Sequence, residues 1–270
     1  MKICVIQMNS QDDKDANLAQ ARSLLQEALE ATKPDIVVLP ELFTYLGGTV
    51  DGAKQAAETV PDGPAFEMLQ NAATNHGVFV YGGSMAERDG DKYYNTTLVF
   101  DPSGTLIARY RKIHMFDVVT PDGKVFHESA TYTPGEEIVT FDMAGIAVGA
   151  TICYDLRFPE LYISLVKAGA KLIFAPAAFT LMTGKDHWEV LCRARAIESQ
   201  CYLVAPNQTG PYVEDGVERA SCGNSMIVDP WGTVIGRARD GVGFFAAELD
   251  FAYQDRVRGD LPSLKNRVLS

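Results

Sequence analysis

Residues 145–161 have the sequence GIAVGATICYDLRFPEL. Its first nine residues form an apolar run that is typical of a buried strand. Pro159 suits the first turn of a helix, and later apolar residues recur at helical spacing, so a helix is expected over 158–168. Cys153 therefore lies at a strand-to-helix junction. A helix N-terminus lowers a thiol pKa and offers free N–H groups to an anion, as acyl transfer requires. The alternative is an inert core cysteine, the commoner fate of a lone Cys.

The same alternation of apolar strands and amphipathic helices continues on both sides of this junction. Strands are predicted at 2–8, 36–41, 78–83, 145–153, 171–176 and 201–206, and helices at 14–32, 64–75, 158–168 and about 185–199. This order predicts an α/β fold with mainly parallel connections and helices that cover the sheets. Because no low-complexity linker interrupts the chain, one domain over residues 1–270 is expected.

Two segments share one pattern, namely TLVFDPSGTLIARY (97–110) and SMIVDPWGTVIGRA (225–238). Each predicts a strand, an Asp-Pro-x-Gly turn and a second strand. They are either two unrelated hairpins with a common turn or parts of two similar sheets related by an approximate two-fold. Long loops near 114–135 and 207–221 are candidate walls of a site.

Composition excludes several function classes. The 270 residues are 47% hydrophobic and 22% charged, which is ordinary for a globular protein. The net charge of −11 argues against nucleic acid and anionic membranes as partners. The five cysteines show no CxxC spacing, so a reducing cytoplasm is expected rather than a disulfide framework or a zinc ribbon. The four histidines lack metal-ligand spacing and no phosphate-binding glycine motif is present, so neither metal nor cofactor is expected.

Two charged residues occupy positions comparable to that of Cys153. Glu41 ends the apolar run IVVLPE, and Lys112 follows the second arm of the first hairpin. Taken singly, Glu41 could cap a helix and Lys112 could be solvated. Together, the three residues would lie at strand ends along one rim of an α/β sheet, where ligands bind in such folds.

The chain resembles the nitrilase superfamily of carbon–nitrogen hydrolases. The matching segments follow the family order over nearly the whole chain: LPELF (39–43), YRKIHMFDV (110–118), ICYDLRFPEL (152–161), PAAF…TGKDHWEVLCRARAIESQ (176–200) and VDPWG (228–232). The resemblance implies a four-layer αββα sandwich, a Glu–Lys–Cys triad at Glu41, Lys112 and Cys153, and a second glutamate at Glu128. The alternative for Glu128 is a solvated loop acid.

The residues around Cys153 resemble one branch of this family. Nitrilases usually have Cys-Trp-Glu, whereas Cys-Tyr-Asp-Leu-Arg-Phe-Pro-Glu is similar to omega-amidases and deaminated-glutathione amidases. The segment HWEVLCRARAIESQCYLV is closer to the deaminated-glutathione group. Both groups usually have an aromatic-Gly-His-Ser stretch where this chain has Cys222-Gly223-Asn224-Ser225, so the substrate pocket can differ.

The resemblance thus predicts a thiol amidase for a small carboxylate-bearing amide, with deaminated glutathione as the leading substrate. Omega-amidase activity on 2-oxoglutaramate-type amides, or another amidase or carbamoyl hydrolase activity, is the alternative. In this mechanism Cys153 attacks the amide carbon, Glu41 acts as general base and then acid, and Lys112 with the backbone N–H of Tyr154 stabilises the oxyanion.

Five residues are predicted to bind the substrate. Arg157 either holds a substrate carboxylate or forms an ion pair with Glu160 or Asp155. The remaining candidate pocket residues are Tyr81, Phe179, Thr183 and His187.

A papain-like protease and a non-catalytic binding protein are two other functions that a chain with these residues could have. A papain-like protease pairing Cys153 with His114 or His127 is disfavoured, because neither histidine has an orienting partner in the sequence. A non-catalytic binding protein on the same fold would not need an intact triad. A homodimer is expected through the helices at 158–168 and 185–199, which carry apolar residues in excess: Leu161, Leu165, Val190, Leu191 and Ile197.

Overall fold

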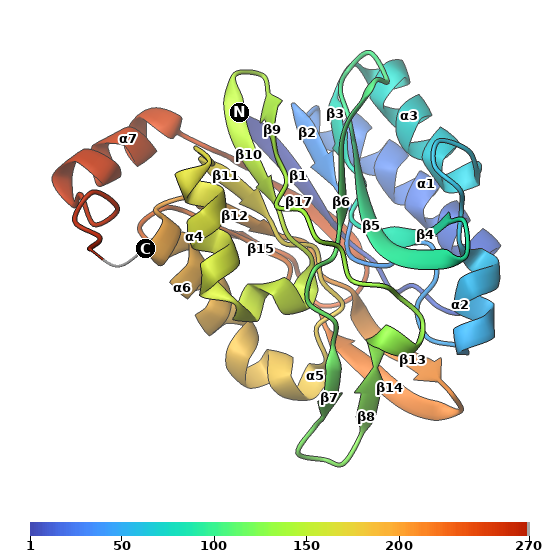
Figure 1. Ribbon diagram of the computed structural model, residues 1–270. Coiled ribbons are helices and arrows are strands. Elements are labelled where there is room, and N and C mark those ends of the chain that lie inside the picture. The colour runs from blue at the N-terminus through green and yellow to red at the C-terminus, as the bar shows by residue number, and fades with distance from the viewer. Residues whose placement is uncertain (269–270) are drawn as a thin grey trace.

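The computed structural model describes residues 1–268 and shows two β-sheets stacked face to face, with helices on both outer faces (Figure 1). The first sheet has the order β17 (Gly243–Glu248), β1 (Lys2–Gln7), β2 (Ile36–Val38), β3 (Phe79–Tyr81), β5 (Lys92–Phe100) and β4 (Met85–Asp89), and β6 (Leu106–Arg111) also pairs with β5. The second has the order β16 (Val234–Arg237), β15 (Met226–Val228), β12 (Tyr202–Ala205), β11 (Leu172–Phe174), β10 (Ile146–Ala150) and β9 (Thr140–Met143).

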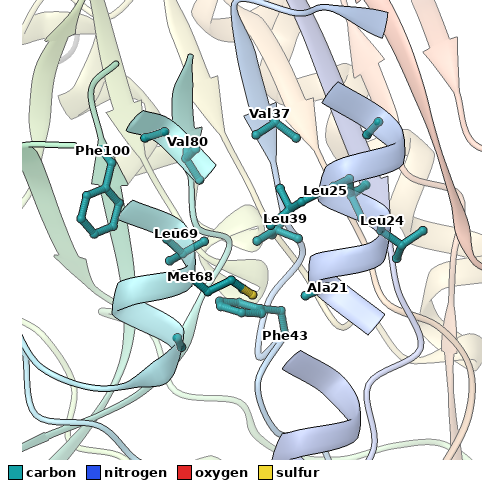
Figure 2. Packing of buried hydrophobic residues seen from close by; sticks show 14 of the residues in the cluster. Ala21, Leu24, Leu25, Val37, Leu39, Phe43, Met68, Leu69, Val80 and Phe100 are labelled. Atoms are coloured by element: carbon teal, nitrogen blue, oxygen red, sulfur yellow. The ribbon is translucent and has the colours of Figure 1, made fainter. Parts of the chain in front are cut away.

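Hydrophobic side chains fill the three spaces between the four layers. Val5, Val38, Leu172 and Val204 belong to the cluster that packs the two sheets together. Helices α1 (Lys14–Thr32) and α3 (Pro64–His76) cover the first sheet, and Figure 2 shows their side chains converging on Val37 and Leu39. Helices α4 (Pro159–Lys167) and α6 (Glu189–Ser199) cover the second sheet through another cluster. The fold is therefore the αββα sandwich that the resemblance implied.

The two Asp-Pro-x-Gly hairpins occupy equivalent places in the two sheets. The order β1, β2, β3 is parallel and is followed by antiparallel β5 and β6, just as parallel β10, β11 and β12 are followed by antiparallel β15 and β16. Oδ1 of Asp101 and of Asp229 accepts two backbone N–H groups of its own turn. The interpretation as two similar sheets is therefore the one that the structure supports.

The prediction that segments 114–135 and 207–221 are loops is corrected by the structure. They fold into hairpins, β7 (Asp117–Val119) with β8 (Val125–His127), and β13 (Thr209–Glu214) with β14 (Val217–Cys222). These strands have few buried side chains, so their periodicity does not stand out in the sequence. The other helices are α2 (Val50–Ala56), the short α5 (Leu181–Thr183) and α7 (Phe251–Asp260).

The apolar surplus on α4 and α6 is smaller than expected. Leu161 and Leu165 are buried within the subunit and Leu191 is half-buried, because α4 packs on α6 and on the second sheet. Val190 and Ile197 remain exposed on α6.

Candidate active site

Cys153 lies in a tight turn that follows β10. Its φ of +46° is in the left-handed region, and its backbone N–H donates to the carbonyl of Pro176 at 2.8 Å. It begins a single 3₁₀ turn, Cys153–Arg157, and α4 starts only at Pro159. The expected junction between a strand and an α-helix is thus corrected to a separate 3₁₀ turn between the strand and α4.

Asp155 holds this turn in place. Its fully buried carboxylate accepts the backbone N–H of Ile152 at 2.8 Å and the hydroxyl of Tyr110 at 2.7 Å. It also contacts Nδ1 of His114 at 2.7 Å. Two segments distant in the sequence, 110–114 and 152–155, therefore meet at this carboxylate, which holds the Cys153 turn without lining the cavity.

Lys112 lies between two carboxylates in the interior. Its Nζ is 2.9 Å from Oε1 of Glu41 and 2.8 Å from both carboxylate oxygens of Glu128. Nδ2 of Asn95 donates to both glutamates as well, at 2.9 and 3.1 Å. Oε2 of Glu41 accepts the backbone N–H of Ala178 at 2.7 Å. Glu128 is thus part of a buried network and not a solvated loop acid.

The charges in this network set the protonation of Cys153. Burial raises the pKa of the Cys153 thiol well above its ordinary value, and the adjacent Glu41 carboxylate raises it further, while Lys112 opposes the shift. This corrects the expectation of a lowered pKa. The resting Cys153 is therefore a neutral thiol next to a carboxylate that can accept its proton.

The two neighbours of Cys153 also have shifted pKa values. Burial alone would lower the pKa of Lys112, but the carboxylates of Glu128 and Glu41 outweigh it and raise the pKa well above its usual range. Burial raises the pKa of Glu128, and the charge of Glu41 adds to this shift against the opposing effect of Lys112. Lys112 therefore stays cationic at neutral pH.

A cavity of about 420 Å³ opens onto this network. Its wall includes Glu41, Lys112, Glu128, Cys153, Tyr154, Phe179 and Thr183 among the predicted site residues. The segments 114–135 and 207–221 contribute Phe116, Phe126, Tyr212 and Arg219, so both segments that were expected to be site walls do line the cavity. The volume is within the range of about 300–1,000 Å³ that is typical of small-molecule sites.

Tyr154 places a backbone donor beside Cys153. Within residues 1–268, its N–H has no hydrogen-bond acceptor, whereas the N–H of Cys153 is already used by Pro176. A free N–H next to the thiol and the Lys112 ammonium are the two donors that an oxyanion needs.

Three predicted pocket residues lie outside the cavity wall. The prediction that Tyr81 lines the pocket is wrong, because Tyr81 is fully buried between the sheets. Its ring centroid is 4.3 Å from that of Phe174. His187 is exposed and lies 3.3 Å from Arg157. The Arg157 guanidinium is 5.1 Å from the ring centroid of Phe179. No carboxylate pairs with Arg157 in the described part of the chain, so the alternative of an ion pair with Glu160 or Asp155 is wrong.

The histidines differ from the sequence expectation. His114 does have an orienting partner, because it contacts Asp155 and stacks on Phe158 with 3.7 Å between the ring centroids. It does not line the cavity, whereas His127 does. The groups whose charges act on Cys153 are Glu41 and Lys112, and no histidine is among them.

Residues 222–225, which stand where the amidases that this chain resembles usually have aromatic-Gly-His-Ser, lie behind the cavity wall. Sγ of Cys222 accepts a hydrogen bond from Nδ2 of Asn207 at 3.1 Å, and Oδ1 of Asn207 accepts the backbone N–H of Phe179. Oδ1 of Asn224 accepts a hydrogen bond from Arg237 on the surface. The sulfur of Cys222 is therefore linked to the cavity wall through Asn207 and Phe179.

Sequence reasoning missed five site residues: Asn95, Tyr132, Asp155 as a positioning residue, Tyr212 and Arg219. An asparagine inside the apolar strand KYYNTTLVF was the available signal for Asn95, because a buried amide needs polar partners. The others had no comparable local signal.

Residues 1–268 contain no group of three or more His, Cys, Asp or Glu residues arranged to hold a metal ion. No helix among them combines the length and apolar character that a membrane span requires.

The chain is similar to known proteins over nearly its whole length. The carbon–nitrogen hydrolase family model matches residues 2–258. A deaminated glutathione amidase from Synechocystis is 40% identical over 97% of this chain and 96% of its own length. An omega-amidase from Danio rerio is 37% identical over 98% and 94%. A Saccharomyces cerevisiae structure from branch 10 of the nitrilase superfamily has a TM-score of 0.88 and 32% identity, covering 100% of this chain and 97% of that one.

Proposed function

This chain belongs to the carbon–nitrogen hydrolase family, and we propose that it is a thiol amidase in which Cys153, Glu41 and Lys112 form the catalytic triad. The observation that carries the proposal is the buried Lys112, held between Glu41 and Glu128 beside the thiol at the base of the cavity. Burying three ionisable groups is costly, and a protein that only binds a ligand has no need of them.

The proposed reaction follows from these positions. The sulfur of Cys153 attacks the amide carbon while Glu41 takes the thiol proton, and the oxyanion is held by Lys112 and the N–H of Tyr154. The C–N bond then breaks as Glu41 returns the proton to the leaving amine, which leaves a thioester. A water that loses its proton to Glu41 hydrolyses the thioester and regenerates the thiol. Glu128 accepts the backbone N–H of Phe116 at 2.7 Å and keeps Lys112 in place.

Deaminated glutathione is the leading substrate and a 2-oxoglutaramate-type primary amide is the second candidate. The name of the Synechocystis relative, deaminated glutathione amidase, supports the first candidate, and the name of the Danio rerio relative, omega-amidase, supports the second. In both substrates the acyl group bears a carboxylate. Arg157 does not line the cavity itself, but it lies against Tyr154 and Phe179, which do, and it has no carboxylate partner in the described chain. Arg157 is therefore the proposed partner of that carboxylate, reached at the edge of these two rings.

A substrate panel tests this function. Wild type is expected to hydrolyse a carboxylate-bearing 2-oxo-acid amide with kcat/KM at least about tenfold above that of its neutral analogue, as a charge-assisted contact predicts. Arg157→Lys should reduce this preference, because Lys lacks the planar fork. Nitriles and carbamoyl compounds serve as competing substrate classes. Absence of amide hydrolysis would contradict the proposal, and equal loss on both amides would limit Arg157 to bracing the turn.

We further propose a homodimer that buries the exposed apolar side chains on and beside α6. Val190, Ile197 and Trp231 are 66%, 46% and 57% exposed, and the Trp231–Gly232 turn contacts Ile197. Light scattering should give twice the 29.5 kDa mass of the chain. Ile197→Asp should dissociate the dimer, whereas Ile138→Asp, at an exposed apolar residue elsewhere, should not. A monomeric wild type at micromolar concentration would overturn this proposal.

The cytoplasm is the proposed compartment. All five cysteines are free, which suits a reducing environment. We also propose that residues 1–270 act as one catalytic domain, because the triad combines residues that follow strands of both sheets. The substrate is a small anionic amide, and neither nucleic acid nor a membrane is proposed as a partner.

A further inference from the structure

Asn95 is a fully buried amide on β5 that contacts both glutamates of the site. Its Nδ2 donates to Oε1 of Glu41 at 2.9 Å and to Oε1 of Glu128 at 3.1 Å. Its backbone carbonyl accepts the N–H of Lys112 at 2.9 Å. The opposite orientation of the amide would turn Oδ1 towards two carboxylates, so the surroundings fix Nδ2 as the atom that faces them.

The amide of Asn95 is costly in this position. Its Oδ1 is buried and has no hydrogen-bond partner in the described part of the chain. The neighbouring residues of β5 are aromatic or β-branched, as is usual in a strand, and an apolar residue in place of Asn95 would bury no unpaired oxygen. Packing therefore does not explain the amide, and its contacts with the two glutamates do.

The hydrogen bonds to the two carboxylates show which oxygen can accept a proton, because each oxygen accepts up to two hydrogen bonds. Oε1 of either glutamate accepts one hydrogen bond from Lys112 and one from Asn95. Oε2 of Glu128 accepts from Lys112 and from a backbone N–H. Within residues 1–268, Oε2 of Glu41 accepts only the backbone N–H of Ala178. The open acceptor position of the pair is therefore on Oε2 of Glu41.

This oxygen is the one beside Cys153. Burial and Glu41 raise the pKa of the Cys153 thiol, and a hydrogen bond from the Ala178 N–H opposes them. The same N–H donates to Oε2 of Glu41 at 2.7 Å, so the sulfur and Oε2 are neighbours. Without Asn95, Oε1 of each glutamate would also have an open acceptor position. A proton bound there, or shared between the two carboxylates, would be off the path from the thiol to the leaving amine.

We propose that Asn95 is a positioning residue that directs the thiol proton of Cys153 to Oε2 of Glu41, because it fills the last acceptor position on Oε1 of both glutamates. The inference rests on the amidase function proposed above. As the sulfur attacks, the S–H bond breaks and an O–H bond forms at Oε2, and the same proton later passes to the leaving nitrogen. The amide of Asn95 exchanges no proton in this sequence.

Three other titratable groups of the cavity wall face the two glutamates, namely Tyr132, Tyr212 and Glu214. Burial raises the pKa of each of them, so neither tyrosine titrates on the acidic side of a pH–rate profile. Glu214 has no hydrogen bond to Asn95 in the described chain. A change in the acidic limb that follows substitution of Asn95 therefore reports on Glu41 and Glu128.

Asn95→Val and Asn95→Thr test the proposal, because their side chains have nearly the same shape and only Thr keeps a donor. The substrate is the carboxylate-bearing 2-oxo-acid amide, and kcat and KM are measured as functions of pH. Asn95→Val should lower kcat about tenfold to hundredfold and change KM by less than about threefold. The acidic limb of kcat/KM should move up by at least about one pH unit, because donors to a carboxylate favour its ionised form. Asn95→Thr should show smaller changes in both.

Thr97→Val is the matched control. Thr97 is also fully buried, two residues further along β5, and its hydroxyl donates to the carbonyl of Gly83 rather than to a glutamate. The control should lower stability, since it leaves a buried carbonyl without its donor, but the acidic limb should stay at the wild-type pH.

The outcomes separate this inference from the proposed function. Circular dichroism checks that each variant is folded, and if Asn95→Val does not fold, the shift in Asn95→Thr decides. An acidic limb at the wild-type pH in the folded Asn95 variants overturns the inference, whatever the fall in kcat, and leaves Asn95 with a structural role. An equal shift in Thr97→Val overturns it too. If wild type hydrolyses no amide, the amidase function itself fails.

Discussion

Cys153→Ala is expected to lower kcat for amide hydrolysis by at least about 10⁴-fold, because no other group can form the thioester. The folded state should persist, since the turn is held by Asp155 and by the backbone contact to Pro176 rather than by the thiol. Steady-state kinetics measures the loss of kcat, and thermal unfolding of the same preparation measures whether the folded state persists. Cys201→Ser is the matched control, because its sulfur lies in the core and bonds to the carbonyl of Ala170. Residual turnover within about tenfold of wild type would show that Cys153 is not the nucleophile.

The backbone at Cys153 allows a second comparison in the same experiment. At a φ of +46°, any residue with a Cβ is strained by roughly 1–2 kcal/mol, and glycine is not. Cys153→Gly should therefore be as inactive as Cys153→Ala but unfold at a higher temperature. An alanine variant as stable as the glycine variant would mean that the turn stores no strain.

That the residues of the proposed triad lie close together could be predicted from local features of the sequence. Glu41, Lys112 and Cys153 each follow an apolar strand, and strand ends in α/β folds converge at one rim. The two Asp-Pro-x-Gly hairpins could be recognised for the same reason, since turn chemistry is local, but whether they belonged to two similar sheets stayed open. Patterns that are confined to neighbouring residues were therefore sufficient for the α/β class and for the charged residues at the strand ends, whereas the four layers were implied by the family resemblance.

The remaining features depend on contacts between distant segments. Asp155 meets Tyr110 and His114, and Asn95 meets Glu41 and Glu128, which no single stretch of sequence reveals. The direction of the Cys153 pKa shift was mispredicted for the same reason. A helix terminus is visible in the sequence, but burial and the nearby Glu41 charge, which dominate, are not. Tyr81 follows this rule too, because its position before Gly82-Gly83 did not show that the second sheet covers it.

Lys112→Met is expected to be both inactive and strongly destabilised. The substitution removes an oxyanion donor, which typically costs about 3–4 kcal/mol of activation free energy. It also leaves Glu41 and Glu128 buried without a countercharge, and breaking a buried ion pair in this way costs about 3–5 kcal/mol of stability. Chemical denaturation measures the second effect. Lys171→Met, which removes an exposed ion pair to Asp255, should cost less than about 1 kcal/mol.

The pH dependence of this destabilisation identifies its cause. Burial and Glu41 already raise the pKa of Glu128 above 4.5, and loss of Lys112 removes the charge that opposes them. A carboxyl group whose folded-state pKa is raised favours folding below its unfolded pKa, and this contribution is lost as pH rises through the folded pKa. The stability gap between Lys112→Met and wild type should therefore narrow as the pH falls from about 8 to about 5. A gap independent of pH would contradict the loss of a countercharge as the cause and would attribute the destabilisation to packing of the Lys112 side chain.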